Sequence, residues 1–180
     1  MVTIMDNNAL LEKSKKFFED RDIPNALETY EKAIDHVDRA KPKNKSDYIL
    51  YLESVLDYCK ENNLIEHEAL VLRTLGRTHS IFKQHAESMK YHYKSLKIQK
   101  RLGKKIETAE GLMFLAEDLE VSGNYDKSIE IFEEASELFK ELGKLIKTEE
   151  IIKEISRLKV FSKTMIEDEY LLNKYQVDKY

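Results

Sequence analysis

Apolar residues recur with the period of an α-helix along almost the whole chain. Short polar stretches interrupt this pattern at regular intervals, for example ENN at 61–63, SGNY at 122–125 and ELGK at 141–144. The strict alternation of a half-buried strand is absent from the sequence. The pattern therefore predicts an all-α protein with helices at about 7–21, 24–40, 46–61, 64–82, 85–102, 105–121, 125–142 and 145–161, and a shorter one near 165–176.

The chain is similar to itself when it is shifted by 40 residues. Residues 70–96 then align with residues 110–136, and small residues fall on small residues at matching positions of both helices. A further shift reaches Ile152 and Ser156, so the helix at 145–161 begins another unit. Small residues let two helix axes approach closely, and one helical hairpin cannot bury both of its faces. The repeat therefore predicts hairpins that stack on one another.

Small residues are also spaced regularly within each hairpin. Twelve residues separate the two small positions in three pairs, which are Ser14 with Ala26, Gly76 with Ser88 and Ala116 with Ser128. The N-terminal pair indicates that the first hairpin follows the same plan over a shorter match. The helix at 46–61 lacks these positions, so it stands outside the regular alternation.

The stretches GLMFLAEDLEVSGNYDKSIEIFEEA (111–135) and ALLEKSKKFFEDRDIPNALETYEKAI (9–34) resemble the tetratricopeptide repeat family. The family's usual unit has about 34 residues, so this chain is similar to a variety with longer helices. The resemblance implies an α–α superhelix of about three to four hairpins. We expect it to occupy residues 1–162, followed by a capping helix and tail at 163–180.

Composition narrows the function classes. Charged residues make up 36% of the chain and the net charge is −4, which specifies no partner by itself. Cys59 is the single cysteine, so an intramolecular disulfide cannot form and a reducing compartment is expected. The sequence has no apolar stretch long enough to span a membrane and no signal-peptide pattern. The chain is predicted to be cytoplasmic.

Catalytic and metal-binding motifs are absent from the sequence. It contains no G-x-S-x-G, P-loop or H-E-x-x-H motif, so we predict a protein that is not an enzyme and needs no cofactor. Cys59 lies on an apolar helical stripe, which favours a buried core thiol over a nucleophile. His85 and His92 share a helix face, but they lack enough further ligands for a metal site.

The resemblance implies that the first helix of each hairpin lines a concave groove that binds a peptide or protein segment. The groove positions implied for this chain are Arg73, Arg77, Glu110, Met113, Phe114, Glu117, Lys153 and Arg157. The two arginines could pair with an acidic peptide while Met113 and Phe114 anchor an apolar side chain. Alternatively, they pair with Glu110 and Glu117 of the next helix. The carboxylate clamp of the family's chaperone-binding members is not reproduced.

Opposite charges occupy equivalent outer-face positions in consecutive repeats. The basic row is Lys90, Lys94 and Lys97, and the acidic row is Glu130, Glu134 and Glu137. The favoured interpretation is that neighbouring helices carry complementary rows, and self-association through these rows is an alternative. Nucleic acid is disfavoured, because the basic row is short and the acidic row would repel phosphates.

The sequence thus predicts a non-catalytic interaction module that holds a protein or peptide of unspecified identity in its groove. Two alternatives remain open. One is a self-assembling scaffold subunit that forms a homo-oligomer, and the other is a regulatory repeat sensor that acts with a separate effector protein.

Overall fold

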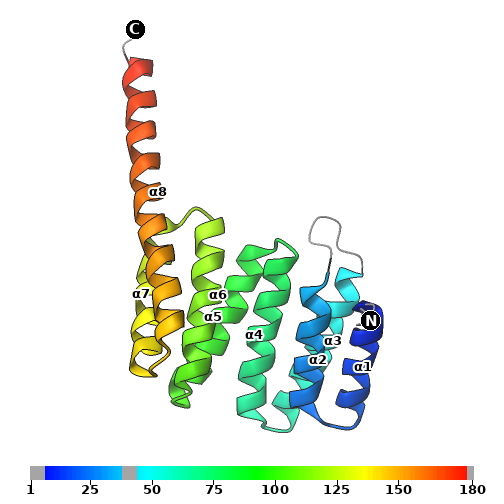
Figure 1. Ribbon diagram of the computed structural model, residues 1–180. Helices are drawn as coiled ribbons and strands as arrows, with labels where there is room; N and C mark the ends of the chain where they lie inside the picture. Colours follow the sequence, from blue (N-terminus) through cyan, green and yellow to red (C-terminus); the bar gives the residue numbers. More distant parts are fainter. Residues whose placement is uncertain (1–6, 38–43, 178–180) are drawn as a thin grey trace, which may run out of the picture. The chain divides into compact units, whose positions relative to one another are not determined.

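The computed structural model describes residues 7–37 and 44–177, with side chains up to residue 166 (Figure 1). These residues form eight α-helices and no strand. The helices are α1 (Asn7–Glu19), α2 (Ile23–Asp35), α3 (Lys45–Glu61), α4 (Ile65–Ile81), α5 (His85–Arg101), α6 (Lys105–Val121), α7 (Tyr125–Glu141) and α8 (Leu145–Val177). The chain divides into two compact units, residues 1–104 with α1–α5 and residues 105–180 with α6–α8.

The all-α prediction is confirmed, and two helices differ from the predicted bounds. α2 ends at Asp35, and the rest of the predicted helix up to residue 40 lies largely outside the described residues. α8 runs without a break to Val177, so residues 163–177 continue it and do not form a separate capping helix. The sequence at 162–164 is SKT, whereas the matching turn at 122–124 is SGN. The polar composition suggested a turn, but the glycine that favours one is missing.

One hydrogen-bond pattern closes the turns that follow α1, α3, α4, α5, α6 and α7. After α6, the N–H of Gly123 donates to the Glu120 carbonyl at 2.9 Å, and the N–H of Asn124 donates to the Leu119 carbonyl at 2.9 Å. Gly123 has φ +79°, the left-handed conformation that ends helices in this way. The equivalent left-handed residues of the other turns are Arg21, Asn63, Lys83, Gly103 and Gly143.

A buried serine joins the two helices of each regular hairpin. In every case the hydroxyl donates to a backbone carbonyl of the facing helix, twelve residues away along the chain. The three bonds are Ser14 to Ala26, Ser88 to Gly76 and Ser128 to Ala116, each at 2.7 Å. A hydroxyl can reach a carbonyl only where two helices lie close together, so the spacing of small residues does correspond to close packing.

The α4/α5 hairpin has the tightest of these contacts. A Cβ atom added to Gly76 would lie 2.6 Å from the ring of His92, well below van der Waals contact. His92 is fully buried, so its ring fills the space above the glycine. At the same level of the α6/α7 hairpin the chain has Ala116 and Phe132, both buried.

In the first unit α3 lies beside α4 and supplies much of the core. Its apolar stripe, which includes Cys59, is buried as predicted. Burial raises the pKa of the Cys59 thiol to about 11, with a smaller contribution from the Glu68 carboxylate. The hydroxyl of Tyr51 donates to Ser14 Oγ at 2.8 Å, because the serine hydrogen is already given to Ala26. This bond fixes α3 against the first hairpin.

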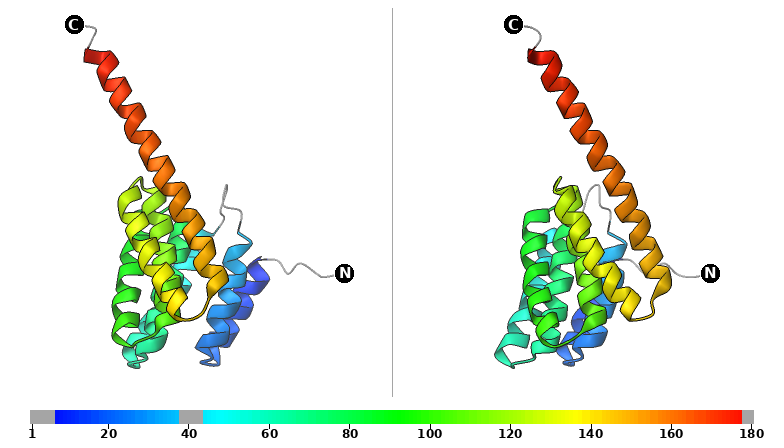
Figure 2. Two further views of the ribbon diagram at one scale, coloured as in Figure 1. Left: turned by 60° about the vertical axis from the view of Figure 1, so that its left-hand side comes forward. Right: turned by 90° about the vertical axis from the view of Figure 1, so that its left-hand side faces the viewer.

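In the second unit the first half of α8 packs on α7 through Ile151, Ile155 and Leu158, which are all buried. Phe161 then makes an edge-to-face contact with Tyr125, the first residue of α7, at 5.2 Å between ring centroids. Beyond this contact α8 continues past the ends of α6 and α7 (Figure 2). Residues 162–177 extend the helix by about 24 Å at 1.5 Å per residue.

None of the helices in the described part of the chain combines the length and apolar character needed to cross a membrane.

Candidate functional site

The second unit contains a largely apolar pocket between α6, the end of α7 and the start of α8. Its volume is about 460 Å³. Seven side chains line it, and they are Ile106, Glu110, Met113 and Phe114 of α6, Phe139 of α7, Lys144 of the turn after α7, and Lys147 in the first turn of α8. The wall is therefore aromatic and aliphatic, with one carboxylate and two ammonium groups.

Three of the predicted groove residues lie together in this pocket. Glu110, Met113 and Phe114 are three and four residues apart along α6, so they share one helical face. Ile106 precedes Glu110 by one turn on that face, and this spacing could have identified it from the sequence. Phe139 could not be found in the same way, because the prediction took groove residues only from the first helix of each hairpin.

Two ion pairs lie at or near the pocket. Lys147 donates to Glu150 at 2.9 Å, one turn further along α8. Lys105, at the start of α6, pairs with Glu141 at 2.8 Å and so links the two ends of the α6/α7 hairpin. Both pairs are exposed and contribute little to stability. The charged groups in the pocket lining itself are the ammonium groups of Lys144 and Lys147 and the carboxylate of Glu110.

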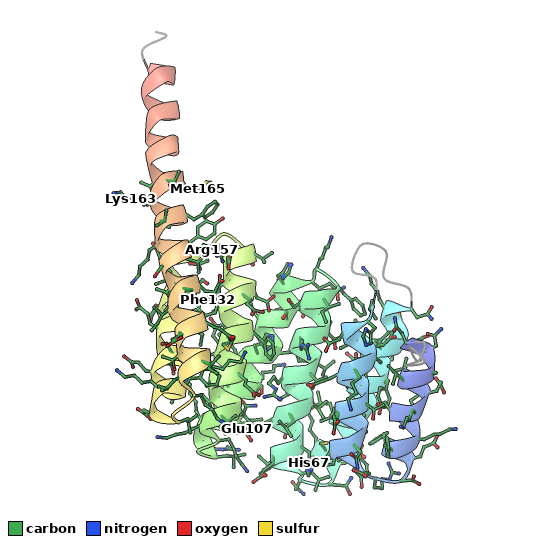
Figure 3. The ribbon with its side chains drawn as sticks, in the orientation of Figure 1. His67, Glu107, Phe132, Arg157, Lys163 and Met165 are labelled. Atoms are coloured by element: carbon green, nitrogen blue, oxygen red, sulfur yellow. The ribbon has the colours of Figure 1, made fainter. Side chains whose placement is uncertain are left out.

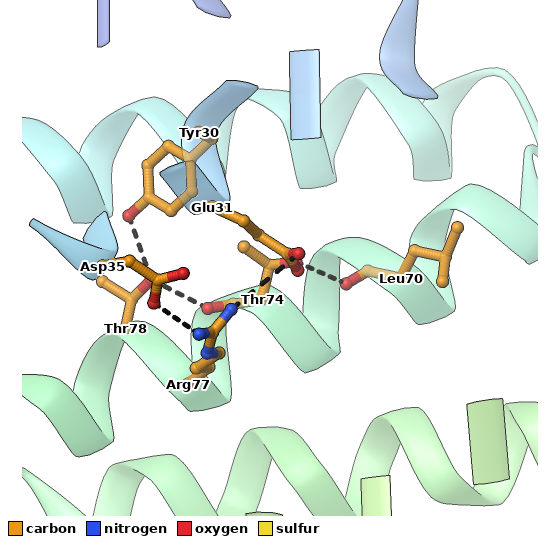
Figure 4. Close-up of polar contacts among 7 residues, drawn as sticks. All are labelled: Tyr30, Glu31, Asp35, Leu70, Thr74, Arg77 and Thr78. Atoms are coloured by element: carbon orange, nitrogen blue, oxygen red, sulfur yellow. Dashed lines mark hydrogen bonds and ion pairs between the residues drawn. The ribbon is translucent and has the colours of Figure 1, made fainter. Parts of the chain in front are cut away.

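Arg77, a predicted groove residue of the first unit, is paired with two acids of α2 (Figure 4). One amino group donates to Asp35, and the other lies 3.8 Å from a Glu31 carboxylate oxygen. Neither acid was among the predicted partners. Because Glu31 and Asp35 are four residues apart on α2, they present two carboxylates on one face. Arg77 therefore joins α4 to α2.

A chain of hydroxyl groups continues this contact into the core (Figure 4). Thr78 donates to the Thr74 carbonyl at 2.8 Å, so the Tyr30 hydroxyl donates to Thr78 at 2.9 Å. Thr74 donates to the Leu70 carbonyl at 3.1 Å. Burial is the main cause that raises the pKa of Tyr30 far above its ordinary range. The α4 face beside Arg77 is thus occupied by contacts within the chain.

Arg157, which is labelled in Figure 3 and was predicted as a groove residue of α8, is also engaged within its unit. It donates to both carboxylate oxygens of Glu120 on α6, at 2.8 and 2.9 Å, and to Glu154 at 2.8 Å. The hydrogen bonds to Glu120 and Glu154 raise the pKa of its guanidinium. Of the three remaining predicted residues, Lys153 and Glu117 lie exposed on α8 and α6. Arg73 lies half-buried on α4.

The two predicted charge rows are largely exposed to solvent. Lys90, Lys94 and Lys97 are exposed on α5, and Glu130 and Glu137 are exposed on α7, where Glu134 is half-buried. Contacts along the same helix engage part of each row, such as Lys90 with Glu87 at 2.6 Å and Lys127 with Glu130 at 2.7 Å. The rows belong to different units, so their mutual pairing stays a prediction.

Among the residues whose side chains are described, no group of three or more His, Cys, Asp or Glu is placed to hold a metal ion.

No protein-family model matches the chain, and no curated protein matches its sequence. Among solved structures, it is similar to the Signal Transduction ATPase with Numerous Domains protein with a tetratricopeptide repeat sensor from Pyrococcus horikoshii. The identity is 16% and the TM-score 0.57, and the match covers 83% of this chain and 27% of that one. A putative kinesin light chain with nearly identical TPR-like repeats from Podosopora anserina matches at 11% identity and a TM-score of 0.47, over 86% of this chain and 95% of that one.

The first of these matches carries the structural argument. The chain spans about a quarter of the length of the Pyrococcus protein, and at this identity the likeness concerns the fold alone. It confirms the predicted architecture, a tetratricopeptide-like solenoid of helical hairpins.

Proposed function

We propose that this chain is a non-catalytic protein-interaction module that binds a peptide segment in the pocket of the second unit. The pocket lined by Met113, Phe114 and Phe139 carries the proposal. It lies on the first-helix face, which is the face that a tetratricopeptide-like fold is expected to offer to partners. Its volume falls within the range of about 300–1,000 Å³ that is common for ligand sites.

The chemistry of the lining selects a peptide with a large apolar side chain beside a carboxylate. The apolar side chain would enter between Phe114 and Phe139, and the carboxylate would lie next to Lys144 or Lys147. Burying one such side chain contributes about 1.5–3 kcal/mol. A single pocket of this kind therefore gives weak binding, and a tight partner would need contacts along more of the first-helix face.

The anionic part of the partner is assigned to the lysines of the second unit and not to Arg77. Arg77 already pairs with Asp35 and Glu31, so a peptide carboxylate would have to displace two existing partners. The remaining predicted groove residues, Arg73, Glu117, Lys153 and Arg157, stay as predicted contacts outside the pocket.

Fluorescence anisotropy with a labelled peptide tests this proposal. The probe is a short peptide with one phenylalanine flanked by glutamates, and the control peptide has alanine in place of the phenylalanine. We expect about tenfold tighter binding of the phenylalanine peptide, since about 1.4 kcal/mol corresponds to that factor. Equal binding of the two peptides would contradict an apolar anchor.

Two variants with matched controls locate the site. Phe114→Ala and Lys144→Glu should each weaken binding of the phenylalanine peptide by fivefold or more, on the order of 1 kcal/mol. Lys140→Glu makes the same charge reversal, and Val121→Ala truncates another apolar side chain, at exposed positions of α7 and α6 outside the pocket. If all four variants bind like the unmodified chain, the pocket is not the binding site.

A further inference from the structure

The first half of α8 has an open face at the position where the earlier repeats carry a helix. The 40-residue shift aligns Ile152 with Leu72 of α4 and Leu112 of α6. Leu72 and Leu112 are 4% and 1% exposed because α5 and α7 cover them, whereas Ile152 is 50% exposed. Ser156 stands where Gly76 and Ala116 accept the interhelical bond, and it is exposed. Within residues 44–177, which the structure describes, no helix therefore covers the first half of α8 as α5 covers α4 and α7 covers α6.

A groove between α7 and α8 marks the place of the missing helix. Its volume is about 410 Å³. It is lined by Ile152, Ser156 and Lys159 of α8 and by Glu133, Ser136 and Glu137 of α7. Lys159 donates to Glu133 at 2.8 Å across its edge.

The segment that follows in the sequence is unsuited to fold back and fill this groove. In the 40-residue alignment Asp168 falls on Ser128, and Tyr175 falls on Ala135. An ionised aspartate cannot donate to a backbone carbonyl, and tyrosine is too large for the close approach of two helices. The chain accordingly continues as one straight helix to Val177.

The open face extends onto the part of α8 that projects from the unit. Val160 and Ile166 are 69% and 63% exposed, and their helical positions lie within 60° of Lys163 on either side. Ile152, eleven residues before Lys163, falls on the same face. Figure 3 shows Lys163 and Met165 on this projecting part. Exposed apolar side chains, with Lys159 and Lys163 between them, thus lie along one face of α8 from the groove to the projection.

The order of residues around Lys163 is self-complementary. Val160 and Ile166 lie three residues to either side of it, and Lys159 and Glu167 lie four residues to either side. A helix with this order matches its own sequence when the two copies run antiparallel.

We propose that α8 pairs with α8 of a second copy, antiparallel and about a two-fold axis near Lys163. Lys159 then lies at the level of Glu167 of the second copy, and the two-fold axis forms this contact twice. Each projecting half covers the Ile152 face of the other copy. Two helices 8–10 Å apart, about the usual spacing for side-chain packing, do not require the small residues of the serine-linked hairpins.

Sedimentation velocity of the full chain is the first test, and we expect a dimer. Val160→Lys and Ile166→Lys should each shift the chain to a monomer, because each places two additional charges in the interface. Met165→Lys is the matched control, since Met165 is 48% exposed and lies next to Ile166 in the sequence but on the face of the helix opposite Lys163. Circular dichroism shows whether each variant stays folded. Ile166→Lys, which lies beyond the part of α8 packed on α7, is the safer of the two.

Two further variants test the antiparallel direction and the position of the axis. Glu167→Lys should raise the dimer dissociation constant at least tenfold, because it places a lysine at the level of Lys159. In a parallel pair position 167 would face position 167 of the second copy, so the change would replace two facing glutamates by two facing lysines. Lys163→Cys should form an interchain disulfide on mild oxidation, and Glu154→Cys, on the opposite face, should not. The single native Cys59 is buried and does not interfere.

A chain that stays monomeric at every accessible concentration overturns the proposal, as does a Val160→Lys variant that dimerises like the unmodified chain. The dimer is independent of the peptide pocket. Phe114→Ala should therefore leave the sedimentation profile unchanged, and Ile166→Lys should leave peptide binding unchanged.

Discussion

The hairpins α4/α5 and α6/α7 have helices of equal length, the same turn and the same serine-to-carbonyl bond, yet they present different surfaces. The α4 face carries Thr74 and Arg77, which hold a polar network to α2. At the equivalent positions, α6 carries Phe114 and Glu117, and Phe114 lines an apolar pocket. A few small and apolar residues therefore determine the hairpin geometry, and the residues at the other positions can form different contacts in each hairpin.

The two hairpins also differ at the point where their helices lie closest, because both the small residue and the large residue packed against it are different. The α4/α5 hairpin pairs a glycine with a buried histidine, and the α6/α7 hairpin pairs an alanine with a buried phenylalanine. Substitutions at these paired positions therefore test most directly how the two hairpins differ.

The largest effect is expected from Gly76→Ala. The added Cβ would lie 2.6 Å from the His92 ring, which is buried and cannot swing into solvent. Such overpacking costs about 1–3 kcal/mol, which urea denaturation measures directly. The double variant Gly76→Ala with His92→Phe copies the pair of the other hairpin and should recover part of this loss. A loss below about 0.5 kcal/mol for the single variant would show that the ring moves aside easily.

Ser88→Ala and Ser128→Ala come next. Each removes a buried hydroxyl that joins two helices and leaves a carbonyl without that donor, which costs about 0.5–1.5 kcal/mol. If the two hairpins are equivalent in this bond, the two losses should agree within experimental error. Ser122→Ala is the control, because that serine bonds only to Asp118 of its own helix and is exposed. A loss of stability at one site only would show that the serine hydrogen bond contributes differently to the stability of the two hairpins.

Arg77→Ala should have a smaller effect, on the order of 0.5–1 kcal/mol, because its ion pairs with Asp35 and Glu31 are partly exposed. Glu117→Ala, at the equivalent position of α6, should change stability by less. A double-mutant cycle with Asp35→Asn isolates the contact between α2 and α4. A coupling of zero would show that the network of Figure 4 adds nothing to stability.

The smallest effect is expected from mild alkali. The raised pKa of the Cys59 thiol, about 11, means that the unfolded chain loses this proton at a lower pH than the folded chain. Stability from this group is therefore complete well below pH 8.5, the ordinary pKa of a thiol, and declines as the pH rises toward 11. At about pH 8.5 the loss should be about 0.4 kcal/mol, and Cys59→Ala should abolish this share of the pH dependence.

The sequence predicted the features that depend on local spacing. The twelve-residue spacing of Ser128 and Ala116 identified the hairpin and its close contact, because helix periodicity makes such positions face one another. The partners of Arg77 were missed, since they lie on α2 and the irregular α3 comes between the two helices in the sequence. The length of α8 was also missed, because a polar stretch without glycine at 163 can either turn or continue as helix.

The candidate site was predictable only in part for a related reason. Glu110, Met113 and Phe114 come from one helix, so the repeat alone placed them on a common face. Phe139 and Lys144 enter the pocket from the end of the next helix and its turn, and their approach depends on tertiary packing. Their side chains have no local pattern that distinguishes them from ordinary core and surface residues.

The left-handed residues of the turns bear on the order in which the chain folds. Arg21 and Lys83 adopt positive φ with a long side chain, at a cost of about 1–2 kcal/mol each, whereas Gly123 and Gly143 adopt it without that cost. A turn with an unfavourable conformation forms only when the packing of its two helices compensates for the cost, whereas a glycine turn can form before the helices pack. We therefore expect the α6/α7 hairpin to act as an early nucleus in refolding. Pulsed hydrogen exchange would then find the amides around Gly123 protected before those around Lys83.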